Sequence, residues 1–268
     1  MPPRSVLFSA AVVFATACLH AEDPQMLRIH WESAKTYTLE TQTETTFQKP
    51  GAENPPQKMD VIQTTTLGVR TDPPSSNHLV QVTFTGVRGE ISSGKDVMHY
   101  DSTKPDESNP KLGQAIGRAV GKSFVLVYDE QDRFRDSRDF SSMASAPGSV
   151  IGLSALADTR DVVNLFRKSL EIGLPPLAVS VGDTWTADET MNFPQAGDTH
   201  VAMNGKFEGI EDREGRKHAK ISFEGKLSSV VKKDKPVANI EIAEGSTMSG
   251  VIFFDLERRV TSYSSYAN

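Results

Sequence analysis

Two long segments of this chain alternate apolar and polar side chains with a period of two. One face of residues 218–230 is apolar: Ala219, Ile221, Phe223 and Leu227. In residues 78–91, the alternation of Val80, Val82 and Phe84 ends at Gly86, and the apolar set then moves to the opposite face. A change of face at a glycine is typical of a β-bulge or a sharp bend. Both segments are therefore predicted to form long, half-buried strands.

Segments before and after the first of these runs predict further strands. They cover residues 35–47 and 61–71, which are rich in threonine, and residues 97–101 and 124–129, and Pro, Gly, Asn or Asp clusters separate several of them. Threonine favours strands, and those clusters favour turns. The first half of the chain therefore has the pattern of antiparallel strands that follow one another in sequence.

Two short helices interrupt this pattern. Asn109-Pro110 is typical of a helix cap followed by proline at the first helical position, and Gly113, Gly117 and Gly121 form a stripe on one face that favours close packing against a sheet. The second helix is predicted over residues 159–172, capped by Asp158 and ended by Gly173. Its apolar stripe consists of Val162, Phe166 and Leu170.

The strand pattern then restarts, which indicates an internal duplication. The segment around Trp185 repeats the one around Tyr37, and Asp255 at the end of its strand resembles Asp101. We therefore expect a mainly β protein, β-rich α+β, with two related antiparallel curved sheets or half-barrels joined by a short helical segment. The expected ranges are 22–140 for the first half, 141–180 for a helical and proline-rich connector, and 181–268 for the second half.

Residues 1–21 have the composition of a secretory signal peptide, with Arg4 ahead of an apolar run too short to span a bilayer. One processing route cleaves after Ala21. The other uses Ala15-Thr-Ala-Cys18, which resembles the lipobox of bacterial lipoproteins but has Ala15 where that motif usually has a larger aliphatic residue; it would leave a lipid on Cys18. Cys18 is the only cysteine, so intramolecular disulfides are excluded. Both routes predict export to the periplasm, the cell surface or the medium.

Composition limits the partners. A formal net charge of -6 offers no basis for binding nucleic acid, and membrane contact is expected only through a lipid on Cys18. No cofactor is predicted. The expected partners are another envelope protein or an apolar ligand.

No catalytic or metal-binding motif emerges from the residues. Residues 117–123 end like a phosphate-binding loop, but three residues separate their glycines where the motif needs four, and the segment follows a helical pattern instead of opening one. The histidines are isolated in sequence; His78 and His218, near the starts of matching strands, are interpreted as surface residues. Asp129, Glu130 and Asp132 are interpreted as a hairpin turn, because they lack the spacing of a calcium loop.

The leader, residues 34–41, residues 121–129 and Leu174-Pro-Pro leading to Val181-Gly-Asp-Thr-Trp185 together resemble an uncharacterised, domain-of-unknown-function family of exported β-rich bacterial proteins. That resemblance implies export and a β-sheet fold, and no activity. The architecture is also similar to that of periplasmic lipoprotein carriers, whose curved sheet closed by helices holds an acyl chain; this similarity is at the level of fold alone.

Two functions are therefore expected for a chain without enzymatic activity. The first is an exported interaction or structural β module of the envelope. The alternative is a carrier for a hydrophobic or lipid-like ligand, with Phe84, Phe223, Phe253 or their neighbours lining its cavity beneath the helix at residues 159–172. Phe166 separates the two functions, because it belongs to an ordinary core in the first and closes a ligand cavity in the second.

Overall fold

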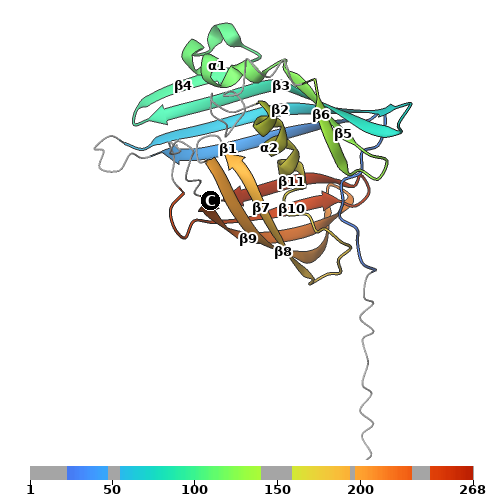
Figure 1. Cartoon of the computed structure of the whole chain (residues 1–268). Coiled ribbons are helices and arrows are strands. Elements are labelled where there is room, and N and C mark those ends of the chain that lie inside the picture. Colours follow the sequence, from blue (N-terminus) through green and yellow to red (C-terminus); the bar gives the residue numbers. More distant parts are fainter. Residues whose placement is uncertain (1–22, 48–54, 140–158, 194–196, 231–241, 268) are drawn as a thin grey trace, which may run out of the picture.

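A computed structural model describes residues 23–47, 55–139, 159–193, 197–230 and 242–267. The chain forms two antiparallel sheets with a helix between them (Figure 1). This confirms the predicted fold class, and neither sheet closes into a barrel. The predicted leader, with Cys18 and Ala21, lies outside the described residues, as do residues 141–158 of the connector, which include the helix cap Asp158.

The first sheet has the strand order β1-β2-β3-β5-β6, and β4 pairs with the distal part of β3. Its strands are β1 (Thr36–Phe47), β2 (Gln57–Asp72), β3 (Asn77–Ser93), β4 (Asp96–Asp101), β5 (Ser123–Tyr128) and β6 (Phe134–Arg138). The second sheet follows chain order, β7-β8-β9-β10-β11. Its strands are β7 (Thr184–Phe193), β8 (Gly197–Arg213), β9 (Arg216–Ser229), β10 (Thr247–Asp255) and β11 (Val260–Ala267).

The change of face predicted at Gly86 is a β-bulge in β3. Thr65 pairs with Phe84, but Thr64 pairs with Gly86, so Thr85 is an extra residue. The extra residue brings Val87 back to the same side of the sheet as Phe84, because Val87 pairs with Gln63 and Gln63 shares a face with Thr65. Val80, Val82, Phe84 and Val87 are therefore all buried, and Ile91 is half-buried.

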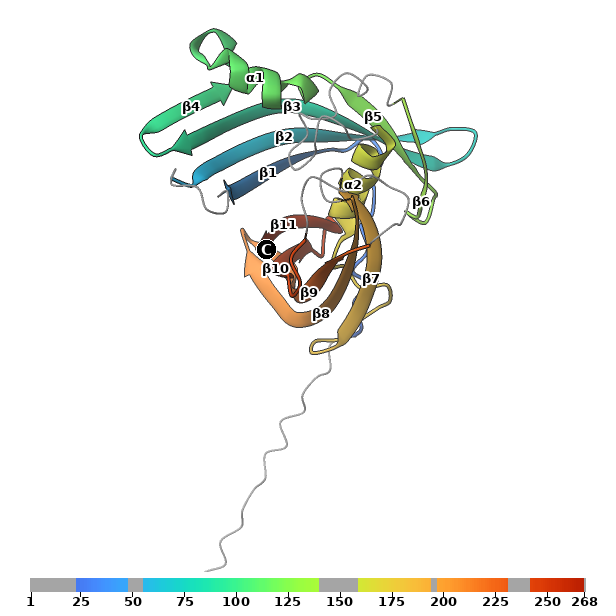
Figure 2. The ribbon, with the colours of Figure 1, turned by 60° about the vertical axis from the view of Figure 1, so that its left-hand side comes forward.

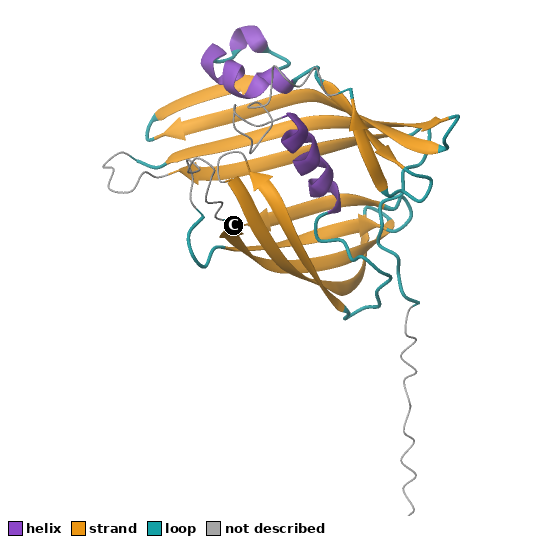
Figure 3. Cartoon of the chain, viewed as in Figure 1, coloured by secondary structure: helices purple, strands orange, loops and turns teal. Residues whose placement is uncertain are grey.

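Helix α2 (Thr159–Glu171) lies between the two sheets (Figures 2 and 3). Gly173, at φ +78°, follows it in the left-handed region, as the predicted stop requires. Val163 is fully buried, and Phe166 and Leu170 pack against the core; the side chain of Val162 lies outside the described part. In the described residues, no helix is long and apolar enough to cross a membrane.

One apolar cluster holds the fold together. It includes Phe84 and Phe124 from the first sheet and Ile221 and Phe254 from the second, together with Val163 of α2. An extended N-terminal segment adds Leu27, Ile29 and Trp31. The two sheets are thus layers over a shared interior, and burial of these side chains is the main source of stability.

Helix α1 (Pro110–Ile116) packs close to β4 through its glycine stripe. Asn109 caps it by accepting hydrogen bonds from the Lys111 and Leu112 amides. A Cβ on Gly113 would lie 2.5 Å from the Tyr100 ring, and one on Gly117 would lie 2.7 Å from its hydroxyl. The close approach predicted from the glycines is confirmed for these two. Short 3₁₀ turns, η1 (Pro105–Glu107) and η2 (Gly117–Ala119), flank α1.

The two halves correspond strand for strand, but with one change from the sequence alignment. Tyr37 and Trp185 are each the second residue of a first strand, as predicted. Asp101 is not the counterpart of Asp255: β4 and α1 are inserted between the third and fourth strands, and β5 pairs with β3 as β10 pairs with β9. The counterpart of Asp255 is Asp129, which directly follows β5. The sequence could not distinguish these, because both Asp101 and Asp129 follow a tyrosine.

Candidate functional site

Polar side chains gather where the N-terminal segment crosses the β5–β6 turn. His30 Nδ1 lies 2.6 Å from Asp132 Oδ2, and His78 Nδ1 lies 2.8 Å from Asp132 Oδ1. The Trp31 amide donates to Asp132 Oδ1 at 3.1 Å. One carboxylate therefore accepts hydrogen bonds from the N-terminal segment and from β3, which are far apart in sequence.

Asp132 is held in this position by the turn itself. Its φ of +59° is in the left-handed region, which aspartate tolerates better than most residues, and its amide donates to Asp129 O. Its side chain is only 5% exposed, whereas that of His30 is 40% exposed. A carboxylate so withdrawn from water requires hydrogen-bond donors, and the two imidazoles and the Trp31 amide supply them.

No sequence pattern predicted that His30, His78 and Asp132 lie in contact. His78 was interpreted as a surface residue, but its side chain is 14% exposed and bonded to Asp132. The prediction that Asp132 lies in a hairpin turn is confirmed, but its role as a hydrogen-bond acceptor for other segments was not predicted. The available signal was the alternation of Leu27, Ile29 and Trp31, which indicates a buried strand that places His30 at the core boundary.

The second half has a related arrangement around Asp255. Asp255 Oδ1 accepts from the Glu257 and Arg258 amides, and Oδ2 accepts from Arg216 Nε at 2.7 Å. His218 pairs with Asp255 across the sheet and is buried, which corrects its interpretation as a surface histidine. Burial would raise the pKa of the Asp255 carboxyl, but the Arg258 amide and the Arg216 guanidinium hold it below its usual value.

Asp129 completes the correspondence in the first half. Its Oδ1 accepts from the Gln131 and Arg133 amides, and its Oδ2 accepts from Arg133 Nε and from Arg135 at 2.6 Å. The hydrogen bond from the Arg133 amide, together with that from Arg135, lowers the pKa of Asp129 to about 2. Both aspartates remain charged and tie a strand end to its turn.

Two buried polar atoms adjoin the His30–Asp132–His78 cluster without a hydrogen-bond partner among the described residues: the Trp31 indole N–H and the Tyr128 hydroxyl. The two rings are neighbours, with centroids 5.5 Å apart. Burial raises the pKa of the Tyr128 hydroxyl, so it stays protonated. Leaving these two groups unpaired lowers the free energy of unfolding, and the aromatic packing around them compensates for that loss.

Helix α2 contributes ion pairs at the border of this region. Arg167 NH1 donates to Glu171 Oε2 at 3.0 Å, and its guanidinium lies over the Phe134 ring. Lys168 pairs with Glu189 and donates to the Thr190 carbonyl of β7. The Arg167–Glu171 pair lies within the helix, whereas the contacts with Phe134 of β6 and with Glu189 and Thr190 of β7 join α2 to a strand of each sheet.

The carboxylates of these clusters hold turns and neighbouring segments in place. Among the residues that the structure describes, no three His, Cys, Asp or Glu side chains are grouped so as to hold a metal ion. The phosphate-loop resemblance at residues 117–123 has the context expected from sequence: a helical segment precedes it, and Ser123 begins β5. The Asp129, Asp132 and Asp255 carboxylates are bound to backbone amides, arginines or histidines that position turns.

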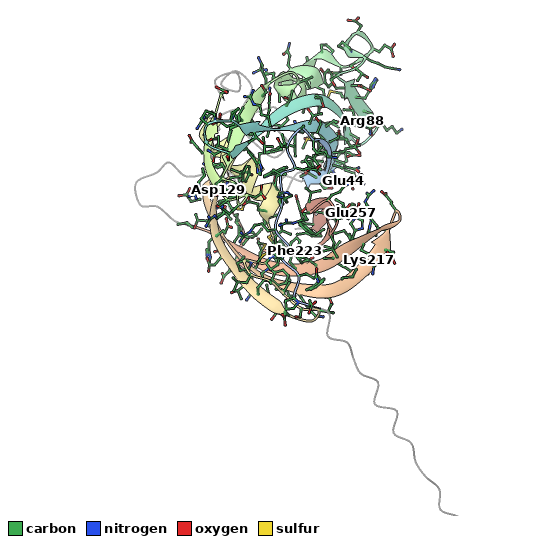
Figure 4. The ribbon with its side chains drawn as sticks, turned by 90° about the vertical axis from the view of Figure 1, so that its right-hand side faces the viewer. Glu44, Arg88, Asp129, Lys217, Phe223 and Glu257 are labelled. Carbon is green, nitrogen blue, oxygen red and sulfur yellow. The ribbon has the colours of Figure 1, made fainter. Side chains whose placement is uncertain are left out.

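The three phenylalanines predicted to line a cavity lie in different surroundings. Phe84 and Phe223 belong to the core, and Phe223 lies over the inner side of the second sheet (Figure 4). Phe253 is on the other face of β10, because its neighbour Phe254 is the core residue. Arg213 stacks over the Phe253 ring at 3.8 Å. The inward-facing phenylalanine of β10 is therefore Phe254, the neighbour of Phe253.

The geometry defines a two-layer antiparallel β protein with an interposed helix and an anchored N-terminal segment. Comparison with protein-family models, curated proteins and solved structures finds no match for the chain.

Proposed function

We propose that this chain is an exported, non-enzymatic β module of the cell envelope that acts by binding other proteins. The observation that supports this most is the packing of α2. Phe166 contacts Phe84 and Phe124 edge-to-face, with centroids 6.0 and 5.6 Å away. The same apolar cluster includes both sheets and the N-terminal segment. A helix packed in this way fills the interior and leaves the outer faces and strand edges as the functional surface.

The inner side of the first sheet also argues against a carrier for long apolar chains. On β2, the residues that share a face with the core residue Leu67 include Gln63 and Thr65, both buried. Their partners on β1 are Thr41 and Leu39. Both polar side chains are already covered by protein, so an acyl chain lying along this surface would have to displace the groups that cover them.

The test is to purify the processed protein without detergent and measure its mass under native and denaturing conditions. The proposal expects the native mass to equal that of the polypeptide, and no fluorescence gain from an apolar dye such as 1-anilinonaphthalene-8-sulfonate. A lipid bound in stoichiometric amount would overturn it in favour of the carrier. The denatured mass also reports cleavage after Ala21 or a lipid on Cys18.

A further inference from the structure

The strand edges of the two sheets differ in protection. Unpaired edges invite pairing with other chains, and proteins protect them with bulges, prolines, charged side chains (most often lysine), short lengths or covering segments. At β4, the His99 carbonyl accepts from the Asn109 amide, and the Asp101 amide donates to Ser108. At β7, the carbonyl of Thr190 accepts from Lys168 of α2.

Three edges remain, β1 and β6 in the first sheet and β11 in the second. β6 has five residues, carries Arg135 and Arg138, and follows a register shift in its pairing with β5. β11 has eight residues and a register shift against β10. β1 has twelve residues in unbroken register with β2, and contains no proline, glycine or lysine. Among the described residues, no strand pairs with its outer edge.

The register identifies which backbone groups of β1 point outward. The Val69 amide donates to the Lys35 carbonyl, so this pair is a hydrogen-bonded one. Bonded and outward-facing residues alternate along an antiparallel strand. The outward N–H and C=O groups therefore belong to the other parity: Thr36, Thr38, Glu40, Gln42, Glu44 and Thr46. The side chains of these residues are exposed on the outer face of the sheet.

A row of carboxylates on that face determines the charge of a partner. Glu44 pairs with Asp60, and Asp60 pairs with Glu90, so three acidic side chains stand side by side across β1, β2 and β3. Like charges in this arrangement are destabilising. Arg88 of β3 pairs with Glu40, 3.5 Å away, and Figure 4 shows Arg88 and Glu44 on the same side of the first sheet.

We infer that β1 receives an extended segment of another protein, which adds to the first sheet as a strand and carries lysine or arginine at alternate positions. Backbone hydrogen bonds along β1 would supply affinity, and the basic side chains would face Glu44 and Asp60. A second copy of this chain is disfavoured, because pairing β1 with β1 brings two acidic rows together. This inference rests on the proposed function and names the partner class.

The probe is a blocked peptide of alternating threonine and lysine, as long as β1, with its binding followed by fluorescence anisotropy. Two peptides of equal length serve as controls: one has glutamate in place of lysine, and one has all its lysines in a single block. We expect the alternating peptide to bind tighter than both. Hydrogen exchange should slow at Thr38, Gln42 and Glu44 when it binds.

The decisive variant is Gln42→Pro, which removes an outward N–H and places a ring at the edge while leaving the bonds to β2 intact. Its control is Gln42→Ala, which removes the side-chain bonds to Asp60 and Glu44 but keeps the amide. We expect the proline variant to bind about tenfold more weakly or worse, and the alanine variant to bind as the wild type does.

A charge pair of variants tests the acidic row. Glu44→Lys should weaken binding by about threefold or more, and Glu224→Lys, an exposed change on β9 with the same charge difference, should leave it unchanged. Equal binding of the alternating and block peptides, or binding that survives Gln42→Pro, would overturn the inference. So would a dimer that Gln42→Pro dissociates, since the occupant would then be a second copy. These outcomes do not depend on bound lipid, so the proposed function is tested separately.

Discussion

Asp129 and Asp255 are bound in the same way at the ends of equivalent strands. In each, Oδ1 accepts hydrogen bonds from two turn amides, and Oδ2 accepts from arginine: from Arg133 and Arg135 at Asp129, and from Arg216 at Asp255. The arginines do not come from matching places in the two halves. Arg135 lies on β6, next to β5, whereas Arg216 lies on β9. Both halves therefore have a charged acceptor at the end of this strand. The arginine that donates to it comes from a different neighbouring strand in each half.

Asp255→Asn tests whether the strand end requires this charged acceptor. The Asp255 side chain is fully buried, and the change leaves Arg216 without its charged partner, so we expect the free energy of unfolding to fall by about 3 kcal/mol. Urea titration at pH 7 measures it. Asp101→Asn is the matched control, because Asp101 bonds only its own turn and should lose much less. Equal losses would show that the strand end does not require a charged acceptor at Asp255.

The same two carboxyls predict acid sensitivity. Their pKa values are lowered in the folded protein, to about 2 for Asp129. A lowered pKa contributes stability that is present above the ordinary value of about 3.9 and is lost as pH falls through the folded value. We therefore expect the urea midpoint to fall between pH 4 and pH 2, and to fall less steeply in Asp129→Asn. A variant as acid-sensitive as the wild type would refute this assignment.

Asp132→Asn tests the junction with the N-terminal segment. Asparagine tolerates the left-handed backbone, so the main change is loss of the charged acceptor for His30, His78 and the Trp31 amide. We expect a loss of about 1–3 kcal/mol, and faster hydrogen exchange at the Trp31 amide. In a protein that already carries His30→Ala, adding Asp132→Asn should lower the free energy of unfolding by less than it does in the wild type. Additive losses would show that the groups are not coupled.

Tyr128→Phe removes a buried hydroxyl that has no partner among the described residues. The ring contacts with Trp31 and Phe134 remain. We expect thermal stability to stay the same or to rise by about 1 kcal/mol, because an unpaired polar group is taken from the interior. A loss of comparable size would mean that the hydroxyl is hydrogen-bonded, for example to a buried water.

Phe166→Ala tests the role of α2. As a core residue in contact with Phe84 and Phe124, it should cost about 3–5 kcal/mol when truncated, with no gain or loss of dye binding. Phe166→Leu is the control and should cost less, because more of the buried volume remains. Altered dye uptake with nearly unchanged melting would instead support the carrier.

Gly113→Ala and Gly68→Ala compare two glycines with different surroundings. A Cβ at Gly113 meets the Tyr100 ring, so we expect a loss of about 1–3 kcal/mol. A Cβ at Gly68, in β2, meets nothing within 4 Å, so this change should be neutral or slightly stabilising. Differential scanning calorimetry of both variants checks the pair, and a larger loss at Gly68 would contradict the packing described for α1.

The sequence by itself determined the elements. Alternation predicted β3 and β9, glycine marked the bulge at Thr85, and Asn109 and Gly173 marked helix ends, because each signal acts over a few neighbouring residues. The tertiary structure decided which strand pairs with which. It placed β4 and α1 as an insertion and made Asp129, not Asp101, the counterpart of Asp255.

The candidate site and the free edge belong to the tertiary structure alone. His30, His78 and Asp132 are far apart in sequence, and each is isolated in its own segment; they meet because the N-terminal segment crosses the β5–β6 turn. Likewise, the composition of β1 indicates a strand but not an edge. Whether a strand is at an edge depends on long-range pairing, and pairing is set by the packing of the whole interior, which local patterns do not encode.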